Sequence, residues 1–310
     1  MVMKVGIVGF NESNGHPFSF SAIINGYRPN AISNAGWRVI QKYLDLRDQS
    51  EFGFEGINIT HAWTQDTAFT KELCYACKIP NPLSKITNML EEVDAVIIAR
   101  DDYQSHKGLA SLFLEQDIPT FIDKPLSLKE KELTYFKPYL KTGKLMSCSA
   151  MRFAKELDRF HRDPSLYGNL YLIRAIGPLS WEKYGIHFLE AIIPFLSTEP
   201  HSVKSLTTKY DSMVISLKDN TLFQVNTAKE QTHNFLPFFI DFCGSKAYSQ
   251  VTVGDNFSMF RRTLWYFFQS VKTKTPAIAP DSTLMLMKVL IAGQRSKLEN
   301  REVFIDEVII

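Results

Sequence analysis

The sequence predicts an α/β protein in two parts: a parallel sheet with helical crossovers, followed by an α+β domain with a large, mostly antiparallel open sheet. Strand-like and helix-like patterns alternate through the first half of the chain, as βαβ units require. Farther on, several strand patterns follow one another directly, which is typical of antiparallel pairing. The 310 residues also exceed the usual size of one domain. We therefore expect two domains, over residues 1–150 and 151–310.

Composition and charge exclude several classes of protein. Apolar residues make up 45% and charged residues 22% of the chain, as in an ordinary globular protein. Basic residues number 35 against 33 acidic ones and are scattered, so nucleic acid is not an expected partner. The first residues lack the pattern of a secretory signal, and no apolar run has the length of about 18 residues that a membrane span needs. We expect a cytoplasmic protein with no membrane partner.

The four cysteines give no sign of a disulfide framework or a metal centre. Cys74 and Cys77 form a CxxC pair inside a predicted helix, without the second ligand pair that zinc needs. We interpret them as half-buried helix positions and expect no bound metal.

The first half contains five apolar runs that predict strands, with helical patterns between them. The expected strands are Lys4 to Phe10, Ile57 to Trp63, Ala95 to Ala99, Thr120 to Asp123 and Leu145 to Ala150. The expected helices are Pro17 to Asn25, Asp66 to Cys77, Ser84 to Glu92, Ser105 to Gln116 and Ser127 to Leu140, the last starting at a capping box of Ser127 and Glu130. Residues 28–56 are an insertion in a simple βαβ unit, and Trp37, Ile40 and Leu44 predict one helix within it.

In the second half the expected elements are helices at both ends and strands between them. They are a helix Phe153 to Arg162, a strand Leu170 to Ile176, a helix Ile186 to Leu196, a meander of strands Ser202 to Tyr210, Ser212 to Leu217, Thr221 to Thr227 and Leu236 to Cys243, and helices Ser258 to Lys272 and Asp281 to Lys297. Asp219 and Asn220 predict one turn of this meander.

A glycine-containing loop follows the first strand, where a Rossmann-type domain would bind a dinucleotide. Such a domain places a GxGxxG motif here, because glycines let the backbone approach a pyrophosphate at a helix N-terminus. After Gly9, however, Asn11 replaces the second glycine and the third is displaced to Gly15, just before His16. Two interpretations follow from the loop alone: a dinucleotide site, or the ordinary turn of a βα unit.

The end of the second expected strand should contact the adenosine ribose of such a cofactor. By register Thr64 or Gln65 faces the ribose, and Asp66 lies slightly beyond it, where it can cap the next helix. An acid for the ribose of NAD is not securely placed, and neither is a base for the 2′-phosphate of NADP. The sequence therefore leaves NAD and NADP as alternatives.

Lys124 and His187 are the two candidate catalytic residues. Lys124 follows a predicted strand, and ligands of open α/β sheets bind beyond the carboxyl ends of the strands. A lysine there, close to a cationic nicotinamide, can act as acid or base or polarise a hydroxyl, whereas the alternative is an exposed loop lysine. His187 opens a predicted helix and can move the proton that accompanies hydride transfer, whereas the alternative is a structural histidine.

Four segments together resemble the Gfo/Idh/MocA family of NAD(P)-dependent oxidoreductases, which includes glucose-fructose oxidoreductase and inositol dehydrogenase. Residues 93–99 followed by His106 are similar to one family segment, and Asp123-Lys124-Pro125 to its Glu-Lys-Pro signature. Met151-Arg152-Phe153 is similar to the segment that leads into the substrate domain, and Tyr184 to His187 to the catalytic-histidine segment. The resemblance spans nearly the whole chain.

The resemblance implies a set of site residues. Lys124 would contact both nicotinamide and substrate, while His187 would handle the proton of the substrate hydroxyl. The expected substrate contacts are Arg152, Glu182, Lys183 and Tyr184, and the expected cofactor contacts are Gly9, Phe10, Asn11, Gly15, His16, Thr64, Gln65, Arg100, Asp101, His106, Asp123 and Lys124. It also implies that the open sheet forms the floor of the site and an interface in a homodimer or homotetramer.

Two departures from the family pattern bear on the chemistry. The family often has Asp four residues before the histidine, where this chain has Lys183, and a proline in the loop where this chain has Arg100-Asp101-Asp102. Either Glu182 replaces the missing acid, or Lys183 near Lys124 depresses the pKa of one lysine by repulsion.

The function that follows is a dehydrogenase or reductase acting on CH–OH groups. Hydride would move to or from a secondary alcohol or carbonyl carbon of a sugar, cyclitol or related polyol. One alternative is a non-catalytic nucleotide- or sugar-binding protein that keeps the fold. Another is hydride chemistry on a larger substrate that the 28–56 insertion contacts.

Overall fold

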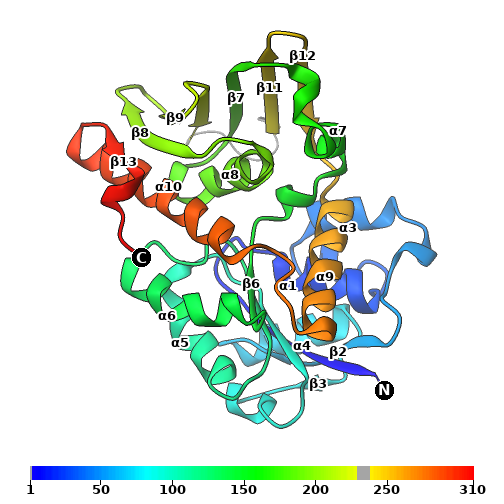
Figure 1. The fold of residues 1–310 in the computed structure, drawn as a ribbon. Helices are drawn as coiled ribbons and strands as arrows, with labels where there is room; N and C mark the ends of the chain where they lie inside the picture. Colours follow the sequence, from blue (N-terminus) through cyan, green and yellow to red (C-terminus); the bar gives the residue numbers. More distant parts are fainter. Residues whose placement is uncertain (1, 229–237) are drawn as a thin grey trace. The chain divides into compact units, whose positions relative to one another are not determined.

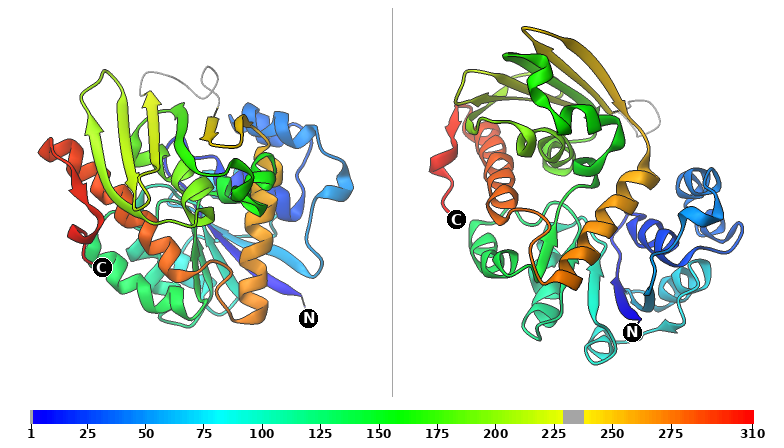
Figure 2. Two further views of the ribbon diagram at one scale, coloured as in Figure 1. Left: turned by 45° about the horizontal axis from the view of Figure 1, so that its top comes forward. Right: turned by 45° about the vertical axis from the view of Figure 1, so that its right-hand side comes forward.

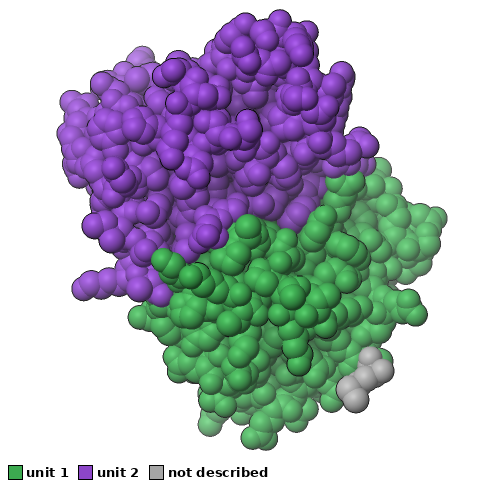
Figure 3. Space-filling view, in the orientation of Figure 1, with its two compact units in different colours: residues 1–127, 135–148, 256–280 green, residues 128–134, 149–255, 281–310 purple. Residues whose placement is uncertain are grey.

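The computed structural model describes residues 2–228 and 238–310, and these form two compact units (Figure 3). The first unit comprises residues 1–127, 135–148 and 256–280, and the second comprises 128–134, 149–255 and 281–310. The domains predicted from the sequence, 1–150 and 151–310, were each a continuous segment, unlike these units. That the chain divides into independently folding domains at residue 150 stays a prediction. The α/β class with one parallel and one mostly antiparallel sheet is confirmed.

A six-stranded parallel sheet forms the centre of the first unit (Figure 2). Its strands, in chain order, are β1 Met3–Val8, β2 Ile57–Trp63, β3 Asn81–Pro82, β4 Ala95–Ile98, β5 Thr120–Ile122 and β6 Leu145–Ser147. They lie in the order β3-β2-β1-β4-β5-β6, so the direction of the crossovers reverses between β1 and β4. The central strands are continuous apolar runs, because both faces of a parallel sheet are covered.

The helices of the first half are close to those expected, with one exception. They are α1 His16–Asn25, α2 Ala31–Asn34, α3 Arg38–Asp45, α4 Thr67–Ala76, α5 Tyr103–Leu114 and α6 Glu130–Lys141. The helix predicted over Ser84 to Glu92 is wrong: only a 3-10 turn, Ile86–Met89, forms there, after the short edge strand β3. Pro82 is compatible with β3 because an edge strand does not need every backbone donor. Helix α6 begins at Glu130 rather than at Ser127.

The insertion at 28–56 packs directly against the glycine loop. Helix α3 buries Ile40 and Leu44, as its periodicity predicted. A Cβ atom on Gly15 would lie 2.4 Å from Ile40 Cδ1 and 2.6 Å from Trp37 Cε3. Glycine at position 15 is therefore required by the close packing of the insertion.

Helix α9, Asn256–Thr273, comes late in the chain but belongs to the first unit, where it packs against α1 (Figure 1). Phe257 contacts Phe52 edge to face, and Arg261 Nε donates a hydrogen bond of 2.7 Å to the Glu51 carbonyl. These contacts hold the insertion against α9. Sequence periodicity predicted this helix but not its grouping with the first half.

The second unit contains a seven-stranded sheet, in the order β12-β11-β7-β10-β9-β8-β13. Its strands are β7 Leu170–Pro178, β8 Pro200–Leu206, β9 Asp211–Leu217, β10 Leu222–Ala228, β11 Phe238–Gly244, β12 Tyr248–Val253 and β13 Val303–Phe304. Neighbouring strands are antiparallel except β10 and β7.

The predicted meander is correct for three strands and wrong for the fourth. β8, β9 and β10 pair in sequence, with Asn220 at φ +68° in the turn between β9 and β10. The strand predicted over Leu236 to Cys243 starts outside the described residues, and its described part, β11, pairs with β7. Because β7 lies between β10 and β11, the fourth strand cannot continue the meander.

The helices of the second unit include one, α10, that packs against a buried tryptophan. They are α7 Asp158–Arg162, α8 Ile186–Ile192 and α10 Pro280–Glu299, with 3-10 turns at Ala150–Phe153 and Lys155–Leu157 where one helix from Phe153 was predicted. Trp181 is fully buried and donates from Nε1 to the Leu290 carbonyl in α10. A Cβ atom on Gly293 would lie 2.6 Å from this indole.

Within the described residues, no helix is both long enough and apolar enough to cross a bilayer.

The contact at Gly293 gives a test of this packing. Gly293→Ala should destabilise the protein by about 1–3 kcal/mol, because the added methyl group overlaps the buried indole. Gly108→Ala in α5 is the matched control: its Cβ meets nothing within 4 Å, so the helix should gain about 0.5–1 kcal/mol. Urea denaturation of both variants measures the difference. Equal shifts would contradict the packing at Trp181.

Candidate active site

The candidate site of the first unit lies at the carboxyl ends of β1, β4 and β5. The order of strands reverses between β1 and β4, and this is where open α/β sheets bind their ligands. The loop after β1 contains Gly9, and a Cβ there would lie 2.7 Å from Pro17 Cγ in α1. Glycine therefore allows this loop to approach the start of the helix closely.

Asn11 joins the loop after β1 to the loop after β4. Its Nδ2 donates to Asp101 Oδ1 at 2.5 Å, and the Asp101 backbone N–H donates to Asn11 Oδ1 at 3.1 Å. The residue that replaces the second glycine of the motif thus holds Asp101 with both ends of its amide.

Gln65, at the end of β2, is joined to the same loop. Its Nε2 donates to the Phe10 carbonyl at 2.6 Å, and its Oε1 accepts from the Phe10 N–H at 3.1 Å. Arg100 donates to the Phe10 carbonyl at 2.7 Å and forms an ion pair with Asp102 at 2.7 Å. The expected cofactor residues Phe10, Gln65 and Arg100 therefore form one hydrogen-bonded group.

Thr64 and Asp66 stabilise the start of α4. The Asp66 carboxylate accepts hydrogen bonds from the N–H groups of Ala68 and Phe69, as a helix cap does. Thr64 is buried, and its hydroxyl donates to the Asp66 carbonyl at 2.6 Å. The acid nearest the expected ribose position is therefore engaged in capping.

Asp123 is a buried carboxylate surrounded by donors. His16 Nδ1 lies 2.5 Å from Asp123 Oδ2, Asn14 Nδ2 donates to the same oxygen at 3.2 Å, and the Lys124 N–H donates to Oδ1 at 2.9 Å. Burial by itself raises the pKa of Asp123, but the charge and hydrogen bond of His16, with a smaller effect of Lys124, hold it below its ordinary value.

Lys124 is 4% exposed, so it is not an exposed loop lysine. Its Nζ lies 3.7 Å from Asp101 Oδ2. Nearby, His106 is fully buried, with Nδ1 3.0 Å from the Leu126 carbonyl and Nε2 2.8 Å from the Arg100 carbonyl. His106 therefore links the loops that follow β4 and β5.

In the second unit, His187 lies in the first turn of α8, directly after a π-helical turn, Trp181–Gly185. Its Nδ1 is 2.6 Å from Ser149 Oγ, and the Tyr184 ring lies 4.9 Å away, edge to face. Sequence reasoning missed Ser149, because a single serine outside a motif gives no signal of its own.

Arg152, an expected substrate contact, is held in a buried ion pair. Its Nε donates to Glu190 Oε2 at 2.6 Å, and its NH2 group donates to Ser282 Oγ at 2.9 Å. Burial raises the pKa of Glu190, although the adjacent guanidinium opposes this rise. Arg152 thereby ties the 3-10 turn at residues 150–153 to α8.

Glu182 and Lys183 have different surroundings. Glu182 Oε1 lies 3.8 Å from Lys297 Nζ, which also donates to Asp211 Oδ1 at 2.5 Å. Lys183 is exposed. Glu182, expected as one replacement for the family's aspartate, thus faces Lys297.

No group of His, Cys, Asp or Glu side chains among the described residues could hold a metal ion. Cys74 and Cys77 are both buried in and just after α4, and burial raises the pKa of each thiol.

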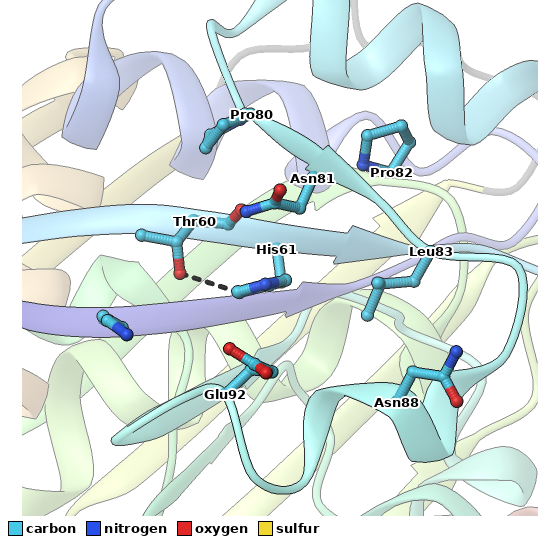
Figure 4. Close-up of a pocket in the computed structure, with 9 residues that line it drawn as sticks. Thr60, His61, Pro80, Asn81, Pro82, Leu83, Asn88 and Glu92 are labelled. Atoms are coloured by element: carbon cyan, nitrogen blue, oxygen red, sulfur yellow. Dashed lines mark hydrogen bonds between the residues drawn. The ribbon is translucent and has the colours of Figure 1, made fainter.

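A polar hollow lies at the β3 edge of the parallel sheet (Figure 4). Its lining includes Lys4, His61, Asn81 and Glu92, and none of the expected site residues. Thr60 Oγ1 lies 2.9 Å from His61 Nδ1, and burial lowers the pKa of His61. This hollow is distinct from the group around Lys124.

Comparison with known proteins supports the family resemblance. Residues 32–146 match the Gfo/Idh/MocA family, described as an oxidoreductase family with an NAD-binding Rossmann fold. The predicted resemblance is therefore confirmed over these residues, and the description of the family agrees with the predicted nicotinamide cofactor. The matched segment begins after the glycine loop. No curated protein sequence matches the chain.

Several solved structures have the same fold over almost the whole chain. Myo-inositol 2-dehydrogenase from Lactobacillus plantarum is 14% identical, with a TM-score of 0.78 and coverage of 98% of this chain and 99% of that one. Scyllo-inositol dehydrogenase from Lactobacillus casei with bound NAD(H) and scyllo-inositol is 14% identical, with a TM-score of 0.74 and coverage of 99% and 100%. A probable dehydrogenase from Thermotoga maritima is 13% identical, with a TM-score of 0.75 and coverage of 99% and 100%. At such identities the likeness is one of fold.

The His16–Asp123 pair predicts how stability depends on pH. Because the pKa of Asp123 is lowered in the folded state, its ionised form stabilises the protein above the unfolded value of about 3.9, and this contribution is lost as pH falls through the folded value. In His16→Asn, burial should raise that pKa above the unfolded value, so ionised Asp123 should destabilise the protein and stability should fall as pH rises through this range.

Thermal unfolding between pH 3 and 7 measures this shift, with His201→Asn, at an exposed position of β8, as the control. Identical pH profiles for wild type and His16→Asn would contradict the electrostatic role of His16.

Proposed function

We propose that this chain is an NAD(P)-dependent oxidoreductase acting on a secondary alcohol or carbonyl carbon of a sugar, cyclitol or related polyol. The observation that carries the proposal is the buried Lys124 just beyond the end of β5, close to the reversal of strand order. The family match supports oxidoreductase chemistry. The inositol dehydrogenases among the similar structures support a cyclitol as substrate.

The first unit has features that fit a dinucleotide. Helix α1 has no acidic residue in its first turn, so the positive end of its dipole favours a pyrophosphate there, and the Asn14 side chain accepts the His16 N–H at 2.8 Å. We propose that the loop residues Gly9 to His16, the group formed by Gln65 and Arg100, and Asp101 hold the cofactor. When bound, a nicotinamide supplies the hydride donor or acceptor.

The cofactor is NAD or NADP. Because the Asp66 carboxylate caps α4, the expected ribose contacts at the end of β2 are the uncharged side chains of Thr64 and Gln65. Neither group carries a charge that discriminates between a ribose hydroxyl and a 2′-phosphate.

Lys124 and His187 divide the remaining chemistry. The Lys124 ammonium orients the reacting oxygen and stabilises negative charge on it. His187, whose Nδ1 lies 2.6 Å from Ser149 Oγ, exchanges the hydroxyl proton. Tyr184, Glu182 and Lys183 contact the substrate, and Arg152 supports this group through Glu190. We also propose a cytoplasmic homodimer or homotetramer that uses the open sheet.

Lys124→Met should lower turnover strongly while leaving nucleotide binding in place. The loss of the ammonium should lower kcat by about 10²–10⁴-fold, the range typical of positioned acid–base groups. Dehydrogenase assays over inositol isomers and sugars, with NADH and NADPH fluorescence titrations, measure the two properties. Lys144→Met, which removes an exposed ion pair with Asp117, is the control.

Unchanged turnover in Lys124→Met would refute the proposed chemistry. Nucleotide binding by the wild type without turnover of any substrate would instead favour a non-catalytic binding protein.

Ser149→Ala should lower kcat by about tenfold with little change in KM. A tenfold loss corresponds to about 1.4 kcal/mol, within the range for one orienting hydrogen bond such as that at His187. Ser149→Thr keeps a hydroxyl and should restore part of the rate. Ser165→Ala, at an exposed turn, should behave as the wild type. A fall in nucleotide affinity without a fall in kcat would argue against this role.

A further inference from the structure

We propose that Asp101 is the residue that positions the Lys124 ammonium, and that Asn11 in turn positions Asp101. This inference rests on the proposed function, in which Lys124 acts on the reacting oxygen. It assigns the carboxylate partner of the lysine to the loop after β4, within the first unit itself.

The two oxygens of Asp101 have different partners. Oδ1 accepts the 2.5 Å hydrogen bond from Asn11 Nδ2, whereas Oδ2 lies 3.7 Å from Lys124 Nζ. The Asp101 side chain is 14% exposed and that of Lys124 is 5% exposed. An ion pair so shielded from water is screened less than a surface pair, so it can fix the direction of the ammonium.

Asn11 removes the freedom that a loop aspartate would otherwise have. Its amide donates to the carboxylate and accepts from the backbone N–H of Asp101, so the main chain and the side chain of Asp101 are held together. A glycine at position 11 could make neither bond. The departure from the glycine motif therefore has a specific consequence for Lys124.

The neighbouring charges have other partners. Asp123, adjacent to Lys124, directs Oδ2 toward His16 and accepts the Lys124 backbone N–H at Oδ1. Asp102 forms its ion pair with Arg100. The Asp101 carboxylate, by contrast, faces the Lys124 ammonium, with Oδ2 3.7 Å from Nζ.

The arrangement also connects two departures of the sequence from the family pattern. Asn11 stands where the motif has its second glycine, and the loop after β4 contains Asp101 instead of a proline. The hydrogen bond from Asn11 Nδ2 to Asp101 Oδ1 joins these two replacements. Asn11 and Asp101 then act together to position the Lys124 ammonium.

The test uses Asp101→Asn, Asn11→Ala and the double variant of the full chain. Asp101→Asn should lower kcat on the order of 10²-fold, the cost of a misplaced catalytic group, and should lower NADH affinity by a smaller factor than kcat. Asn11→Ala should cause part of this loss, and the double variant should be no worse than Asp101→Asn, because both act through one contact. Asp101→Glu should recover part of the rate.

Asp117→Asn is the matched control, since it makes the same chemical change at an exposed ion pair of the first unit. Its kcat and NADH affinity should equal those of the wild type.

A second measurement is independent of activity. Thermal unfolding of Asp101→Asn, Lys124→Met and their double variant should give non-additive shifts of the midpoint, because the two side chains contact each other. Additive shifts, or full kcat in Asp101→Asn, would overturn the inference. A wild type without turnover, but with non-additive shifts, would refute the proposed function and leave the Asp101–Lys124 coupling supported.

Discussion

The buried carboxylate of Asp123 is the charge on which the first unit's site depends. An ionised group removed from water needs compensating donors, and here they come from three parts of the chain: His16 at the start of α1, Asn14 in the loop before it, and the backbone of Lys124. Satisfying this one charge brings the loop after β1 to the end of β5. Lys124 is held beside Asp123 by its backbone N–H, and its ammonium thereby lies near Asp101.

The elements predicted well are those whose signal is local. β2 was predicted with its observed limits, because an apolar, β-branched run needs no knowledge of its neighbours. Pairing is not local: β11 departs from the expected meander because β7, more than 60 residues earlier in the chain, lies between it and β10. The helix expected over Ser84 to Glu92 failed for a related reason, since the chain there pairs an edge strand and then makes only one 3-10 turn.

In the candidate site, too, local features could be predicted and contacts between distant residues could not. Strand ends and family segments pointed to Lys124 and His187, and both lie where those patterns put them, at a strand end and at a helix start. Their partners could not be predicted. Ser149 and Glu190 lie 38 residues from the residues they contact, and neither stands in a motif. Gly15 was expected as part of a nucleotide-binding loop. The close packing of Trp37 and Ile40 against it is a second reason for a glycine at this position, and the sequence alone did not indicate it.

The tryptophan buried in the second unit has a consequence for how this protein can change over time. The indole of Trp181 lies against both Gly185, in its own π-helical turn, and Gly293, more than 100 residues away in α10. Any larger residue at either glycine requires a smaller one at 181, and any smaller residue at 181 leaves a void that either position can fill. A change at one of these three positions therefore requires compensating changes at the others. Through the Trp181 indole, α10 thus constrains the shape of the turn that precedes His187.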